Sequence, residues 1–144
     1  MKRSSKIGLG VLVILVLIQF IPIERNNPAV TSEIPAPQPV KAILKRACYD
    51  CHSNETVWPW YSRIAPVKFI IQHHVDEGRH ELNFSAWDQM PARKKAKASH
   101  EMIEEIEKGK MPTWDYLLMH PDAKLSEQDI RVLKDWAQSM EGAP

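Results

Sequence analysis

The sequence predicts an all-α fold, with an N-terminal apolar helix and a proline-rich linker ahead of one small helical domain. Apolar residues recur at helical spacing in four segments after residue 40, and no segment alternates as a β-strand does. Glycine is scarce at five residues, whereas the eleven prolines cluster, a pattern typical of helices separated by stiff connectors. With 144 residues, the chain is long enough for one compact domain and an appendage.

The chain begins with a basic head, residues 1–6, followed by an apolar run, residues 7–23, that contains no charged residue. As a helix rising about 1.5 Å per residue, this run spans roughly 25 Å, near the lower limit for crossing a bilayer. The pattern predicts an uncleaved transmembrane anchor over residues 1–24, with everything after it on the outer side of the cytoplasmic membrane. A cleaved signal peptide is the alternative, although residues 22–37 offer no good small-residue cleavage site.

Residues 25–39 are polar and contain four prolines. Proline disfavours helices and central strands, so we expect a solvated, extended linker of about 40 Å at most. The folded domain is then expected over residues 40–144. The formal net charge of the whole chain is only +1, which argues against nucleic acid as a partner.

The first two helices of the domain are expected around the cysteines and in the middle of the chain. Apolar residues from Val40 to Cys51 fall at i, i+3, i+4, i+7, i+8 and i+11, a helical stripe. A second helix is predicted from Pro66 to Glu77, because proline is favoured at a helix start and Gly78 is a typical stop.

Two further helices are expected in the C-terminal half. One runs from Pro91 to Lys108 and is stopped by Gly109. The last begins after Ser126, which can cap it together with Asp129 three positions later. We expect the first and last helices of the domain to pack together.

Both cysteines of the chain belong to one segment, Cys-Tyr-Asp-Cys-His at positions 48–52. A single close pair is not a disulfide framework, which needs several cysteines spread along the chain. Two thiols at this spacing can reach the two vinyl groups at one haem edge, and the next residue directs an imidazole at the iron. The motif predicts one covalently attached haem c, with Cys48 and Cys51 as thioether attachments and His52 as the proximal iron ligand.

Two other kinds of site remain open for the same residues. A thioredoxin-like redox pair also uses C-x-x-C, but in a βαβ context that this sequence lacks. A zinc site needs a second closely spaced pair of ligands, and the adjacent His73 and His74 point in different directions on a helix. Haem attachment is therefore the favoured interpretation.

Further sequence blocks accompany the motif in a fixed order: Cys-Tyr-Asp-Cys-His-Ser-Asn at 48–54, Trp-Pro-Trp-Tyr-Ser-Arg-Ile-Ala-Pro-Val at 58–67, His-Val-Asp-Glu-Gly-Arg at 74–79, Leu-Asn-Phe-Ser-Ala-Trp at 82–87, Met-Pro at 111–112 and His-Pro-Asp-Ala-Lys-Leu-Ser at 120–126. In these blocks, which cover roughly residues 40–139, the chain resembles c-type cytochromes and, more closely, a family of small bacterial membrane-anchored haem-binding domains. The resemblance implies a cytochrome c-like helical domain around one haem on the periplasmic side.

Cytochromes resembling class I take a methionine as distal ligand, some sixty residues after the motif and usually before a proline. Met111 stands fifty-nine positions after His52 and precedes a proline, so the resemblance implies that Met111 is the distal iron ligand. Met90, also before a proline, is the runner-up, and Met102 is assigned to core packing on a helical face. Ligation by a second histidine stays open, with these candidates: His73, His74, His80, His100 and His120.

In class I relatives, the other ring nitrogen of the proximal histidine donates to a proline carbonyl, here expected from Pro66 or, second, Pro59. Methionine ligation raises the reduction potential, and a filled sixth position excludes peroxide. The resemblance therefore implies an electron carrier with a redox partner protein, and not an enzyme. The alternative is a haem-based peroxidase, or a haem sensor or assembly subunit, with a labile sixth ligand.

Overall fold

The computed structural model describes residues 3–141, whose ordered elements are helical apart from one isolated parallel bridge between Ser32 and Ala86. Along the chain the elements are α1 (Arg3–Leu17), η1 (Ile18–Phe20), α2 (Gln38–Ala47), α3 (Tyr49–His52), η2 (Trp60–Arg63), α4 (Val67–Glu81), η3 (Trp87–Gln89), α5 (Ala92–Glu107), α6 (Trp114–Met119), η4 (Pro121–Ala123) and α7 (Glu127–Glu141). The helical class predicted from the sequence is confirmed for this range. Residues 1–2 of the predicted basic head and residues 142–144 lie outside it.

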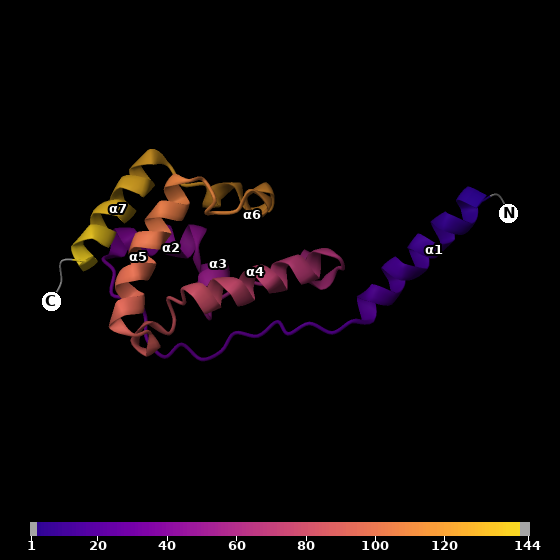
Figure 1. Ribbon diagram of the computed structural model, residues 1–144, viewed down its shortest axis with the longest axis horizontal. Coiled ribbons are helices and arrows are strands. Elements are labelled where there is room, and N and C mark those ends of the chain that lie inside the picture. Colours follow the sequence, from indigo (N-terminus) through magenta and orange to yellow (C-terminus); the bar gives the residue numbers. More distant parts are fainter. Residues whose placement is uncertain (1–2, 142–144) are drawn as a thin grey trace.

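Helices α5 and α7 lie side by side, and α2 packs against α7, as the sequence predicts for the first and last helices of the domain (Figure 1). Their apolar faces form one core, whose most deeply buried large side chains include Val40, Leu44 and Leu133. Helix α3 follows α2 directly and packs against α4. Figure 1 shows α4 leading away from this core towards α1, which projects from the far end.

The predicted helical stripe before the cysteines is real, but the helix does not run through the motif. Val40, Ile43, Leu44 and Ala47 are all buried on one face of α2. At Cys48 the backbone leaves helical geometry, with φ −130° and ψ −30°, so α2 ends there and the short α3 begins. This break turns the motif towards α4.

Gly78 does not end a helix, contrary to the sequence prediction, because α4 continues to Glu81. The other two predicted helix boundaries, the end of α5 and the start of α7, are correct. Gly109 follows α5 with φ +67°, a conformation that glycine adopts without strain. At the start of α7, the Ser126 hydroxyl accepts from the Asp129 amide at 3.1 Å, and the Asp129 carboxylate accepts from the Ser126 amide at 2.8 Å.

The predicted transmembrane helix over residues 7–23 is wrong. Helix α1 has 15 residues and ends at Leu17, which gives a length of only about 22 Å against a hydrocarbon core of about 30 Å. Pro22 disfavours helical geometry at Ile21, which is extended with ψ 119°. Among residues 3–141, no helix combines the length and apolar character needed to cross a membrane. The predicted single-pass location in the membrane is therefore wrong as well.

The short η1 that follows α1 is instead fixed to the residues at the start of α4. The Gln19 side chain donates to the Ala65 carbonyl at 3.2 Å and accepts from the Ala65 amide at 2.9 Å. The buried ammonium of Lys68 donates to the carbonyls of Gln19 and Ile21 at 2.8 and 2.7 Å. These contacts give the N-terminal helix a defined place relative to the domain.

The proline-rich segment is not a solvated linker over its whole length, because residues 26–34 lie along the domain. The Thr31 amide donates to the Ser85 carbonyl, and the Ile34 amide donates to the Phe84 carbonyl, each at 3.0 Å. The Ile34 side chain is only 1% exposed and belongs to the core. We call residues 26–34 the N-terminal strap.

Arg79 of α4 fixes the beginning of this strap. Its guanidinium donates to five acceptors on the strap and on the loop after the motif: Asn26 O, Asn26 Oδ1, Asn27 Oδ1, Ser53 O and Thr56 Oγ1, at 2.8 to 3.4 Å. One side chain therefore joins the strap, α4 and the residue next to the predicted iron ligand.

Candidate functional site

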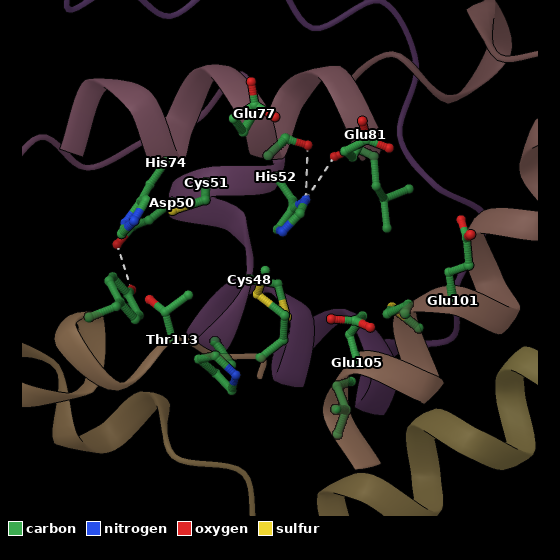
Figure 2. Close-up of a pocket in the computed structure, with 18 of the residues that line it drawn as sticks. Cys48, Asp50, Cys51, His52, His74, Glu77, Glu81, Glu101, Glu105 and Thr113 are labelled. Carbon is green, nitrogen blue, oxygen red and sulfur yellow. Dashed lines mark hydrogen bonds between the residues drawn. The ribbon is translucent and has the colours of Figure 1, made fainter. Parts of the chain in front are cut away.

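The four predicted site residues, Cys48, Cys51, His52 and Met111, line a single cavity of about 480 Å³. Its walls come from α3, α4, α5 and the segment before α6, and Figure 2 shows the motif residues facing into it. Apolar side chains make up much of the lining: Ala47, Leu82, Phe84, Ala98, Met102, Ile106, Pro112 and Leu125. A mostly apolar cavity of about 300–1,000 Å³ is typical of a site for a small molecule or a cofactor.

The His52 ring is held by two backbone carbonyls at the C-terminal end of α4. Its Nδ1 lies 3.0 Å from the Gly78 oxygen and 3.0 Å from the Leu82 oxygen, as the dashed lines in Figure 2 show. Two acceptors assign the proton to Nδ1, so Nε2 keeps its lone pair for a metal. The prediction of a backbone carbonyl partner is confirmed, but neither Pro66 nor Pro59 supplies it.

Electrostatics favour a neutral His52 imidazole, the form that binds a metal. Burial lowers the pKa of His52, and the two carbonyl acceptors and the nearby Glu81 oppose this shift only in part. A neutral ring oriented through Nδ1 is the usual arrangement of a metal-binding histidine.

Helix α4 comes this close to the motif because residue 78 is glycine. A β-carbon on Gly78 would lie 2.4 Å from the Cys51 carbonyl oxygen and 2.8 Å from its carbonyl carbon. Both are backbone atoms, so neither can move aside as a flexible side chain would. The glycine thus has a packing role in the helix interior, which its local sequence does not reveal.

The two cysteines are free thiols, and their surroundings disfavour a redox-active pair. Burial raises the pKa of Cys48 to about 12 and that of Cys51 to about 12, and the nearby carboxylates of Asp50 and Asp115 add to the shift of Cys51. Thiol–disulfide catalysis needs a lowered thiol pKa, the opposite of what is found. Among the described residues, no group of three or more His, Cys, Asp or Glu side chains could hold a metal ion, which removes support for zinc.

The methionine candidates for the distal iron ligand differ in their position relative to the cavity. Met111 lines the cavity and is 39% exposed, on the segment that follows Gly109. Met90, the runner-up, packs against the core and does not line the cavity. Met102, assigned to core packing from the sequence, packs against the core and also lines the cavity, so it joins the candidates. Of the other histidines, His74 is among the lining residues.

The charged side chains around the cavity are acidic. The carboxylates among the described lining residues are Asp50, Glu77, Glu81, Glu101, Glu104 and Glu105, and no lysine or arginine joins them (Figure 2). Several are paired with lysines on the outer side of α5, such as Glu104 with Lys108 at 2.6 Å. A negative surrounding stabilises the more positively charged, oxidised state of a bound metal.

Several contributors to the site were not found by sequence reasoning. These are the carbonyls of Gly78 and Leu82, the side chain of Met102, and Tyr116, whose hydroxyl donates to Asp50 inside the motif at 2.8 Å. Backbone carbonyls leave no mark on a sequence pattern, and the Tyr116 contact spans 66 positions. One sequence signal was available for Met102: it lies one helical turn from Ile106, on the same face of the same helix.

The residues present fit a haem. An apolar cavity holds two thiols, an imidazole with a free Nε2, and a thioether, which are the groups that attach haem and bind its iron.

Comparison with known proteins agrees with this geometry. A family model described as a haem-binding domain matches residues 13–139, most of the chain. No curated protein and no solved structure matches the chain. The match includes the motif, α4, α5 and the segment that carries Met111, so the cavity lies wholly within it. The chain therefore belongs to the haem-binding domain family.

Proposed function

We propose that this haem-binding protein is a monohaem c-type cytochrome that carries electrons. Cys48 and Cys51 attach the haem as thioethers, His52 is the proximal ligand and Met111 the distal one. The observation that carries the proposal is the His52 ring, fixed through Nδ1 by two carbonyls, in the same cavity as both thiols. That arrangement leaves one imidazole nitrogen available beside two attachment points.

Covalent attachment requires no oxidant. The Cys48 and Cys51 thiols would each add across one vinyl group of the haem, with sulfur bonding to the carbon next to the ring and the thiol proton going to the terminal carbon. The raised pKa of both thiols keeps them protonated and unreactive towards disulfide exchange. The break between α2 and α3 at Cys48 brings both sulfurs to the cavity together with His52.

Bound haem supplies a one-electron couple between ferric and ferrous iron. The protein's own residues set its properties. The neutral His52 ring donates its lone pair, Met111 favours the ferrous state, and the apolar lining restricts water. With His52 and Met111 both holding the iron, the protein would exchange electrons with a redox partner and would offer no open site for a substrate.

A second candidate is a haem peroxidase or sensor with a labile sixth ligand. One observation favours it: Met111 is 39% exposed and lies outside any helix, so it can leave the iron more readily than a buried ligand would. His74, which lines the cavity with its Nδ1 3.8 Å from Asp115, is then the candidate for proton transfer.

Spectroscopy of the haem-loaded protein separates the two functions. The cytochrome proposal predicts a low-spin spectrum with the near-infrared methionine–iron band in the wild type. That band is lost in Met111→Ala and kept in Met102→Ala and Met90→Ala, the two matched methionine controls. An absent band in the wild type, together with immediate cyanide or peroxide binding, contradicts the carrier and supports the labile sixth site.

A further inference from the structure

The second residue between the two cysteines, Asp50, makes a contact that reaches across the cavity. The Tyr116 hydroxyl on α6 donates to Asp50 Oδ2 at 2.8 Å, and both residues line the cavity. The bond joins the haem-attachment motif directly to the segment that follows Met111. It is the one hydrogen bond described between the side chains of α3 and α6.

On the motif side, Asp50 is a rigid anchor. Its other carboxylate oxygen, Oδ1, accepts from the Val57 amide at 3.0 Å, and its carbonyl accepts from the Thr56 hydroxyl at 2.7 Å. Both carboxylate oxygens are therefore engaged, and the side chain cannot rotate without breaking two bonds. A donor that bonds to Oδ2 is held in a fixed position relative to the motif.

On the α6 side, Tyr116 is also restrained. The His120 ring stacks on it with centroids 4.1 Å apart and planes at 15°. Burial, and then the bond to Asp50, raise the pKa of Tyr116, so the phenol stays protonated and remains a donor. Its neighbour Asp115 lies 3.8 Å from His74 of α4, which gives a second and weaker link between α6 and α4.

The segment that carries Met111 comes directly before α6. Its start is fixed by the Met111 amide, which donates to the Glu105 carbonyl at 3.2 Å. Residues 111–113 then line the cavity without helical structure until α6 begins at Trp114. The segment is thus held at one end by α5 and at the other by Tyr116.

We propose that Asp50 and Tyr116 are positioning residues that keep the Met111 segment closed over the haem, so that a residue inside the attachment motif controls release of the sixth ligand. This inference rests on the proposed Met111 ligation. On this inference, the protein is a stable electron carrier while the Asp50–Tyr116 bond is intact, and its haem site admits external ligands when the bond is lost.

The test is the rate at which cyanide binds to the ferric haem-loaded protein, since cyanide enters after Met111 leaves. Tyr116→Phe removes only the hydroxyl and is expected to speed binding roughly tenfold or more, the effect of losing a hydrogen bond to a charged acceptor. The matched control is Tyr61→Phe, whose hydroxyl lies 3.5 Å from His120 and makes no described hydrogen bond to Asp50. It should bind cyanide as slowly as the wild type.

A second variant keeps the inference testable if Tyr116→Phe fails to fold. Asp50→Asn can accept from only one of the two donors, Val57 and Tyr116, and should also speed cyanide binding. If Tyr116→Phe and Asp50→Asn both match Tyr61→Phe while the wild type keeps its methionine–iron band, the inference is wrong and Met111 ligation stands. If the wild type lacks that band, Met111 ligation itself fails, and the inference fails with it.

Discussion

Gly78 of α4 and Cys51 of α3 approach each other so closely that a β-carbon on residue 78 would lie 2.4 Å from the Cys51 carbonyl oxygen. The same approach places the carbonyls of Gly78 and Leu82 3.0 Å from His52 Nδ1. Close packing of two helices and orientation of the iron ligand are therefore one structural feature. A single methyl group at residue 78 tests both.

Gly78→Ala is expected to destabilise the protein by about 1–3 kcal/mol, because the added methyl group must push α4 away from the motif backbone. The displaced carbonyls then hold the His52 ring less firmly. Chemical denaturation of the haem-loaded variant measures the first effect, and the exchange rate of the His52 Nδ1 proton in NMR measures the second.

The matched control is Gly10→Ala, another helical glycine, where nothing lies within 4 Å of the added methyl group. It should leave stability within about 0.5 kcal/mol of the wild type or raise it slightly, since alanine favours helices. Equal behaviour of the two variants would show that the close approach has no energetic consequence.

Arg79→Ala is expected to lower the free energy of unfolding by about 2 kcal/mol, because it leaves two partly buried acceptors, Ser53 O and Thr56 Oγ1, without their charged donor. The strap should then become accessible, so limited proteolysis should cut within residues 26–34. Arg131→Ala serves as the control, since the hydrogen bond and the ion pair described for that exposed side chain are both with residues of its own helix. Strap cleavage at the wild-type rate in Arg79→Ala would contradict this role.

Glu105→Gln is expected to raise the reduction potential of the bound haem. Removing a negative charge from the cavity lining destabilises the oxidised iron. The effect is on the order of tens of millivolts, since about 1 kcal/mol corresponds to roughly 40 mV for one electron. Glu107→Gln on the same helix is the control: Glu107 is paired with Lys134, as Glu105 is with Lys108 and Lys110, but it lies outside the lining, so the potential should change far less. Redox titration of both variants measures the two shifts in reduction potential. A fall in potential for Glu105→Gln would contradict the stabilising effect of the acidic lining on the oxidised iron.

The haem-free protein is expected to lose stability as the pH falls below about 6.5. Burial lowers the pKa of His52 below its ordinary value of 6.5, so the unfolded chain takes up the proton first. The stabilising contribution is therefore present above pH 6.5 and lost as the pH falls towards the folded-state pKa. His52→Asn, which does not titrate, should show a shallower decline in thermal stability over this range. Parallel curves for the two proteins would exclude His52 as the cause.

The sequence predicts the parts of this fold that depend on neighbouring residues. Apolar spacing identifies α2, the turn at Gly109 ends α5, and Ser126 with Asp129 begins α7. Prediction from the sequence fails where a contact between residues far apart in the chain determines the local structure. Gly78 looks like a helix end until the Cys51 backbone is placed beside it.

The N-terminal region shows the same limit. The prolines of residues 25–39 correctly exclude a helix there until α2 begins, but they say nothing about the carbonyls of Phe84 and Ser85 that bind the strap. Likewise, the apolar run of residues 7–23 gives no sign that Gln19 bonds to Ala65 or that the helix ends at Leu17. At the site, residue types and spacing predict the motif, and the family resemblance predicts Met111. These residues line one cavity, whereas the contact of Tyr116 with Asp50 depends on tertiary structure alone.

The central claim is covalent attachment of haem through Cys48 and Cys51, and the most direct measurement is a pyridine haemochrome spectrum after acid–acetone extraction. The chain is expressed with cytochrome c maturation machinery, beside a Cys48→Ser, Cys51→Ser double variant. Our account predicts a c-type α-band that stays with the wild-type protein and is absent from the extracted double variant. A colourless wild-type protein, or haem that passes into the solvent, would contradict it.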